Sequence, residues 1–303
     1  MVYSENERGF LKLFNKIKNY FQKSLERKKR RLEYKLSFKN KFEISPFYST
    51  DYQNPSDIDL ITVSFNSPKL IDYQIRMFKK FLKGNFRHII CDNSTKKEAA
   101  EEIKEICTKY DVSYIRVQDR KTPNGYSNSH AIALNWIWKN VARKRENNFA
   151  FLDHDIFPIE PIEPFEYVKD HPVFGRYVTV PSGKWYMWAG FSFFNFKTVQ
   201  NLPLNFHRYK KFGFISVHGK NWMDTGSANW NCLYSKIDKS RLKQYTDGFF
   251  DFVTGERTDW GAENFAHYLD GKNWFHIFDG GNRLDTEGDR IKRIYSLLDK
   301  MLL

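Results

Sequence analysis

Hydrophobic and polar positions follow one another in a regular order between residues 58 and 158. Short runs rich in β-branched and aromatic residues predict strands, and apolar residues at helical spacing between them predict helices. The expected strands are 58–65, 86–91, 112–117 and 149–152, and the expected helices are 70–82, 96–110 and 128–141. Strands that alternate with helices predict right-handed crossovers and a mostly parallel sheet.

The second half of the chain has a less regular pattern. Segments 173–180 and 185–196 are typical of two strands around a Pro-Ser-Gly turn, and the residues after them are rich in Trp, Gly and Asn. Aromatic residues make up 17% of the chain, which is enough to bury a substantial core and excludes global disorder. We therefore expect an α/β body over residues 58–303, with a regular half at 58–158 and a second half at 159–303.

The first 45 residues have a different pattern. Phe10, Phe14, Ile17, Phe21 and Leu25 recur at spacings of four, three, four and four, so they line one face of a helix. The same segment carries 13 basic and five acidic side chains, a net charge of +8 out of +13 for the whole chain. We expect a basic amphipathic extension, joined to the body by a proline-containing linker at 46–57.

This basic extension has two interpretations. A basic face beside an apolar face suits an anionic membrane surface, where each basic residue contributes roughly 1 kcal/mol near the headgroups. Alternatively, the apolar stripe packs on the body and the basic tail is solvated. Binding to nucleic acid is disfavoured, because basic and aromatic residues do not go on interleaving further along the chain.

Three observations concern the location of the protein. The longest uncharged apolar run, 185–196, has 12 residues and is too short to cross a bilayer. The N-terminus lacks the apolar stretch of a secretory signal. Cys91, Cys107 and Cys232 are odd in number and scattered, which fits a reducing compartment. We expect a cytoplasmic protein, either free or peripheral on a membrane.

Polar residues follow the expected strands. Asn66 ends the first, Asp92 and Asn93 end the second, and Asp153 and Asp155 end the fourth. The carboxyl ends of parallel strands meet at one edge of a sheet, where ligands bind. Two carboxylates at i and i+2 project to the same side and repel each other unless a cation lies between them. The pair predicts a Mg²⁺ or Mn²⁺ site completed by substrate phosphates and water, or else an ordinary exposed turn.

These residues, in this order, resemble the glycosyltransferases of the GT-A fold, similar to the large family-2-like group that uses nucleotide-sugar donors. The resemblance covers about residues 57–158 in order and 173–285 more loosely. It rests on Val63-Ser-Phe-Asn66, Cys91-Asp-Asn-Ser-Thr95, Gly125-Tyr-Ser-Asn128 and Leu152-Asp-His-Asp155. It implies a Rossmann-like, mostly parallel central sheet flanked by helices, with the basic helix as an N-terminal extension.

The resemblance also implies roles in donor binding. Phe65 would contact the nucleotide base, Asp92 the uracil or ribose, and Asn128 the diphosphate. Asp153 would bind both the donor and the metal.

Asp155 is the second metal ligand that the resemblance implies. Segment 274–278 resembles a late strand whose His completes the metal shell in some of these families, so His276 would be the third ligand. The alternative for a lone His between aromatic residues is a packed position in the core.

Two carboxylates are candidates for the catalytic base that takes the acceptor's proton. Asp259-Trp-Gly-Ala-Glu-Asn264 resembles a segment of several such enzymes in which the acidic residue faces the acceptor, and this makes Glu263 one candidate. Asp224 is the other. Both are also common as residues at the start of a helix. Inverting relatives have Glu-Asp where this chain has Glu263-Asn264, so inverting and retaining chemistry both stay open.

Trp185, Trp188 and Trp260 would stack on sugar rings as an acceptor platform, or belong to the core. The implied reaction is metal-dependent transfer of a sugar from a UDP- or GDP-sugar to a hydroxyl of a glycan or glycolipid. One alternative is a sugar nucleotidyltransferase, although the Gly-rich loop expected after the first strand is replaced here by Asn66-Ser-Pro-Lys69. The other is an adaptor without enzymatic activity that binds membranes or nucleic acid through residues 1–45.

Overall fold

The computed structural model describes a large part of the chain in two compact units, Met1–Lys41 and Phe42–Leu303. The described residues are 14–22, 24–25, 28, 32, 48–117, 126–180, 183–207, 215–217, 220–222, 224–260, 262, 264–277 and 288–303. In the first unit residues 14–22 are helical, as the apolar spacing predicts. Among the described helices, none is both long and apolar enough to span a membrane.

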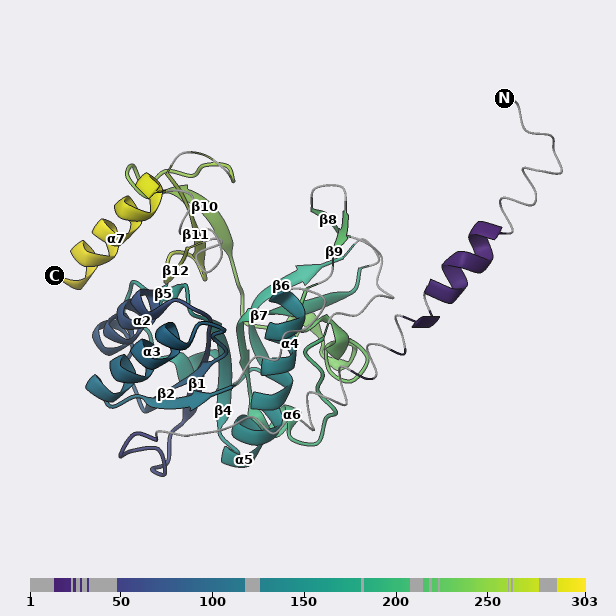
Figure 1. The fold of residues 1–303 in the computed structure, drawn as a ribbon, viewed down its shortest axis with the longest axis horizontal. Helices are drawn as coiled ribbons and strands as arrows, with labels where there is room; N and C mark the ends of the chain where they lie inside the picture. Colours follow the sequence, from purple (N-terminus) through teal and green to yellow (C-terminus); the bar gives the residue numbers. More distant parts are fainter. Residues whose placement is uncertain are drawn as a thin grey trace. The chain divides into compact units, whose positions relative to one another are not determined.

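A six-stranded sheet forms the centre of the larger unit (Figure 1). Its strands, in spatial order, are β3 (Ser113–Arg116), β2 (Phe86–Asp92), β1 (Ile58–Ser64), β4 (Asn148–Asp153), β7 (Trp185–Phe194) and β6 (Val173–Thr179). β1 pairs in parallel with β2 and β4, and β2 pairs in parallel with β3. Only β7 runs antiparallel to its neighbours. The mostly parallel α/β sheet is therefore confirmed.

Helices cover both faces of this sheet. α2 (Pro68–Phe81) and α3 (Lys97–Lys109) pack on one face, and α4 (Tyr126–Ile137) packs on the other. Alternate side chains of β1 point to opposite faces, so Leu60 packs with α2 and Ile61 packs with α4. β1 and β4 are almost wholly buried, because helices cover both faces of the sheet there. α4 continues into a π-helical segment, Trp138–Ala142, which the helical spacing does not predict.

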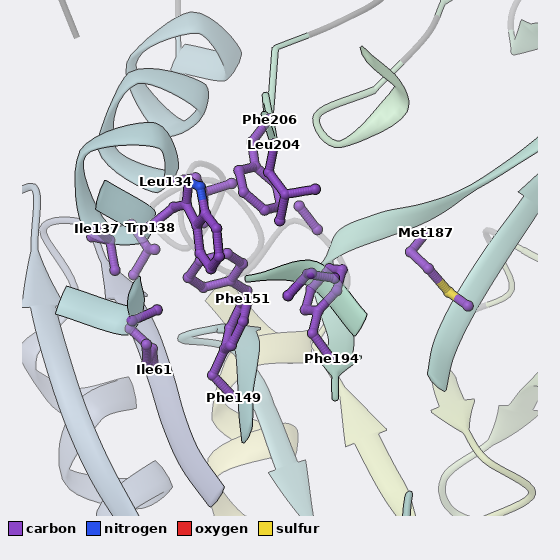
Figure 2. Packing of buried hydrophobic residues seen from close by; sticks show 14 of the residues in the cluster. Ile61, Leu134, Ile137, Trp138, Phe149, Phe151, Met187, Phe194, Leu204 and Phe206 are labelled. Atoms are coloured by element: carbon purple, nitrogen blue, oxygen red, sulfur yellow. The ribbon is translucent and has the colours of Figure 1, made fainter. Parts of the chain in front are cut away.

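Aromatic rings fill the face beneath α4. Figure 2 shows Phe149 and Phe151 of β4 packed among Trp138, Phe194 and Phe206. The ring centroids of Phe149 and Phe194 are 4.9 Å apart, and those of Trp138 and Phe149 are 5.5 Å apart. Burial of each such ring stabilises the fold by roughly 1.5–3 kcal/mol.

The larger unit also contains an antiparallel sheet of four strands, and its first strand in the sequence follows directly after β4. Its spatial order is β10 (Asp247–Asp251), β11 (Phe265–Leu269), β12 (Trp274–His276) and β5 (Ile156–Pro158). β4 ends at Asp153 and β5 begins at Ile156, so the chain passes from one sheet to the other within three residues. α7 (Gly288–Leu302) packs against this sheet through Ile294 and Leu298.

The remaining elements are short. They are α5 (Arg143–Arg145), α6 (Phe196–Val199), the paired strands β8 (Ile215–Val217) and β9 (Lys220–Trp222), and five helical segments: the π-helical η1 given above and the single 3₁₀ turns η2 (Pro164–Tyr167), η3 (Ser227–Asn229), η4 (Tyr234–Lys236) and η5 (Lys239–Arg241).

The described part of the expected linker is bonded to the body. Arg87 donates hydrogen bonds to the carbonyl oxygens of Tyr52 and Asn54, at 3.1 and 2.6 Å. Arg145 donates to the same Tyr52 carbonyl at 2.5 Å. These hydrogen bonds from two arginines hold residues 48–57 against the body, so this segment does not extend freely into solvent.

Buried histidines make the stability of this unit depend on pH. Burial lowers the pKa of His88 in β2 to about 3, and its ring stacks on Phe78 at 4.3 Å. Burial likewise lowers the pKa of His154 to about 4. Below pH ~6.5 the unfolded chain takes up protons that these folded histidines do not accept.

We therefore expect the free energy of unfolding to fall as the pH drops below about 6.5, by about 1.4 kcal/mol per pH unit for each such histidine. Urea denaturation between about pH 5 and 7 measures this slope. His88→Gln keeps a polar partner for Thr62. In this variant the dependence of the free energy of unfolding on pH should be smaller by the contribution of one histidine, about 1.4 kcal/mol per pH unit. A slope equal to that of the wild type would contradict the assignment.

Candidate functional site

The acidic turn, residues 153–155, carries the chain between the two sheets. Gln74 of α2 holds it in place: its Nε2 donates to the carbonyl oxygens of Asp153 and Ile156, each at 2.9 Å. Its Oε1 accepts a hydrogen bond from the Thr62 hydroxyl at 2.9 Å. Gln74 and Thr62 are fully buried. A buried amide that satisfies two carbonyls on either side of the turn fixes the backbone there.

Asp153 faces the six-stranded sheet. Its Oδ1 lies 3.4 Å from Nε2 of His130, which belongs to α4. Burial raises the pKa of Asp153; the nearby His130 opposes this, and the charge of Asp224 adds to it. A cation next to this carboxylate would relieve both the burial penalty and the repulsion from Asp224.

Asp155 faces the four-stranded sheet. Its Oδ1 lies 3.7 Å from Nε2 of His276. The two meet because β5 pairs with β12, where Ile156 stands opposite His276. Both side chains are buried, with 7% and 5% of Asp155 and His276 exposed. Burial lowers the pKa of His276 well below its usual range, helped by the charges of neighbouring basic groups.

Trp188 and Gly190 of β7 complete the surroundings of the turn. The Trp188 ring centroid lies 5.1 Å from that of His276. A Cβ atom on Gly190 would lie 2.4 Å from Oδ2 of Asp153 and 2.3 Å from the Trp188 ring. Glycine is therefore required where the indole and the carboxylate approach the strand.

The structure thus brings several predicted site residues together, namely Asp153, Asp155, His276, Trp188 and Asp224. Asp224 is close enough to raise the pKa of Asp153. Its own Oδ1 accepts a hydrogen bond from the backbone N–H of Thr225 at 2.7 Å. The alternative of a residue at the start of a helix has a counterpart only in the single 3₁₀ turn η3, which begins three residues later.

Two predicted residues are placed differently from the expectation. Asp92 is fully buried, and its oxygens accept hydrogen bonds from the Ser94 N–H at 2.9 Å, Tyr114 at 2.9 Å and Arg116 at 2.6 Å. These contacts use the carboxylate inside the protein, so a direct contact with a ribose does not fit this placement. Trp185 is 2% exposed and packs on Tyr234 at 5.1 Å, so it belongs to the core and offers no face to an acceptor.

Of four other predicted residues, two have described side chains and two do not. Phe65 is half-buried directly after β1. Asn128 lies in the first turn of α4, but its side chain is outside the described residues, and so is all of Glu263. Trp260 is 45% exposed and contacts Phe265, with ring centroids 6.1 Å apart.

Sequence reasoning missed His130 and Gln74. His130 could have been found, since it lies two residues after Asn128 in a helix expected to begin near the diphosphate. Gln74 gave no local signal, because it stands between apolar residues of a helix and its partners come from other strands.

The three expected metal ligands, Asp153, Asp155 and His276, do not form one cluster in this structure. Among the described side chains, no group of three His, Cys, Asp or Glu residues is gathered to hold a metal ion. Asp155 and His276 approach each other, while Asp153 lies against His130 and Gly190. Mg²⁺ is usually held by one or two carboxylates together with substrate phosphates and water. Asp153, Asp155 and His276 are nevertheless residue types that could hold a divalent cation.

Fold and site define a mixed α/β protein with an acidic turn at the carboxyl end of β4. No protein-family model and no curated protein matches the chain. One similar solved structure is an apo structure of WbbM, a bifunctional glycosyltransferase, with 13% identity and a TM-score of 0.33. The match covers 48% of this chain and 33% of that one. A similarity this distant carries no argument about what this chain does.

We expect Gln74→Met to destabilise the protein by roughly 3 kcal/mol, because it leaves two carbonyls and a hydroxyl buried without their partner. Urea denaturation followed by circular dichroism measures this. Lys80→Met, at an exposed position of the same helix, should change the free energy of unfolding by less than about 0.5 kcal/mol. Equal effects of the two changes would exclude the role given to Gln74.

We expect Gly190→Ala to displace the Asp153 carboxylate or the Trp188 indole, at a cost of roughly 1–3 kcal/mol. Gly248→Ala is a matched control, because its nearest contact would be 3.3 Å away on the movable Phe250 ring. The free energy of unfolding, measured by urea denaturation, and the tryptophan emission spectrum should change in Gly190→Ala. Both should stay near the wild-type values in Gly248→Ala. If neither quantity changes in Gly190→Ala, Asp153 and Trp188 do not approach Gly190 as closely as described here.

Proposed function

We propose that this protein is a glycosyltransferase of the GT-A type, which transfers a sugar from a UDP- or GDP-sugar to a hydroxyl of a glycan or glycolipid. The acidic turn carries this proposal: Asp153 and Asp155 stand where a mostly parallel sheet binds its ligands, with His130, Asp224 and His276 around them. Such a set of carboxylates and imidazoles suits the binding of a divalent cation and a diphosphate.

A bound Mn²⁺ or Mg²⁺ would stabilise the charge on the leaving diphosphate as a Lewis acid. Asp155 and His276 would hold it, with Asp153 beside it. Burial and the charge of Asp224 raise the pKa of Asp153, so a positive charge in the site would stabilise its ionised form. Phe65 and Asn128, which follow β1 and open α4, would contact the nucleotide.

The acceptor would bind on the side of Trp188 and Asp224. The half-buried Trp188 ring offers an apolar face to a sugar ring. The Asp224 carboxylate would take the proton of the attacking hydroxyl, with Glu263 as the second candidate for this base. Trp260 would extend the acceptor surface. Residues 1–45 would rest on an anionic membrane surface and bring the enzyme to a lipid-linked acceptor.

The experiment is a nucleotide-release assay with Mn²⁺ across a panel of UDP- and GDP-sugars. Asp155→Asn should lower turnover by about 100-fold or more, the scale on which loss of one electrostatic group slows a reaction. Asp170→Asn, an exposed carboxylate away from the acidic turn, should keep wild-type turnover. Undiminished donor binding and turnover in Asp155→Asn across the whole panel would refute the proposal.

A further inference from the structure

His276 is the last member of a series of bonded side chains that begins on β6. Arg176 Nε donates to Asp247 Oδ2 at 2.8 Å, and the same oxygen lies 3.1 Å from Nε2 of His267. Nδ1 of His267 lies 3.1 Å from Nδ1 of His276. Nε2 of His276 faces Asp155 Oδ1 at 3.7 Å. The series joins β6, β10, β11 and β12 to the acidic turn.

The Asp247 end of the series decides which ring nitrogens carry protons. Asp247 is paired with Arg176, so its carboxylate can only accept hydrogen bonds. Nε2 of His267 must therefore carry the N–H that meets it. A neutral imidazole has one N–H, so Nδ1 of His267 accepts, and the donor across 3.1 Å is Nδ1 of His276. The lone pair of His276 is then on Nε2, toward Asp155.

The charges along the series agree with these protonation states. Burial alone would raise the pKa of Asp247, but the hydrogen bond from His267 and the charge of Arg176 lower it overall, which keeps the carboxylate ionised.

Packing holds the two rings in this arrangement. His267 and His276 are direct partners in the β11–β12 register, and their exposed fractions are 1% and 5%. Phe249 packs on the His267 ring, with ring centroids 5.0 Å apart. Trp188 covers the His276 ring, and the Arg176 guanidinium lies 5.7 Å from the Trp188 ring centre. Neither imidazole can turn over without moving its neighbours.

We infer that Arg176, Asp247 and His267 form a positioning series, which holds His276 so that its Nε2 lone pair and the Asp155 carboxylate face each other across a site for one divalent cation. A carboxylate oxygen and an imidazole nitrogen 3.7 Å apart are both ligand types of divalent cations, so one ion between them could contact both. Partners of this kind orient a metal-bound histidine and set its tautomer. The inference rests on the proposed metal-dependent function and adds three positioning residues to it.

The first test reads the tautomers in the wild-type protein without metal. Selective ¹⁵N labelling of histidine, with long-range proton–nitrogen NMR, should show the proton of His276 on Nδ1 and that of His267 on Nε2. The opposite tautomers would overturn the inference. Because this measurement needs no variant, a failure of any variant to fold leaves it intact.

The second test uses Mn²⁺ as the probe, in the presence of UDP, with pulsed electron paramagnetic resonance. The wild type should show coupling of Mn²⁺ to an imidazole nitrogen. His267→Phe should lose this coupling and bind Mn²⁺ about 10- to 100-fold more weakly. His267→Gln, which offers both an acceptor and a donor, should restore most of the affinity. Asp170→Asn, at an exposed position that is not part of the series, should keep both the coupling and the affinity.

The outcomes separate this inference from the proposed function. Nitrogen coupling that persists in His267→Phe, or Mn²⁺ bound by the wild type without nitrogen coupling, overturns the positioning series and leaves the glycosyltransferase proposal standing. No Mn²⁺ binding by the wild type with UDP, together with no nucleotide release in the donor panel, refutes both.

Discussion

The passage of the chain from one sheet to the other depends on one buried amide. Gln74 of α2 donates hydrogen bonds to the carbonyl oxygens of Asp153 and Ile156. It thereby fixes the short connection between β4 and β5. Because the amide binds the backbone at both ends of this connection, the directions of the two aspartate side chains are restricted. Asp153 is committed to the parallel sheet and α4, and Asp155 is committed to β12.

The site is consequently built by two sheets with different tasks. The parallel sheet supplies the carboxylate next to His130, and β7 supplies Gly190 and Trp188 around it. The antiparallel sheet supplies a buried imidazole. The net charge of +13 lies mainly in residues 1–45, while the ionisable side chains at the acidic turn are carboxylates and histidines. The excess basic charge and the acidic turn therefore belong to different parts of the sequence.

Much of this could be predicted from the sequence. Short runs rich in β-branched and aromatic residues located β1 to β4, and helical spacing located the helices between them. Asp153 was placed correctly since parallel strands end at one edge. The burial of Asp92 could not be predicted, because its partners Tyr114 and Arg116 depend on the β2–β3 register. The His267–His276 contact likewise needs the pairing of two late strands.

The order in which the parts are made has a consequence for synthesis of the protein. Asp155 leaves the ribosome more than a hundred residues before His276, and β5 finds its sheet partner only when β12 has been made. A nascent or truncated chain that ends before β12 can pair its parallel strands, yet it holds one side of the site alone. Such a fragment also lacks Trp274, which packs against Phe78, Phe191 and Phe193, so loss of the last strands removes part of the core together with the partner of Asp155.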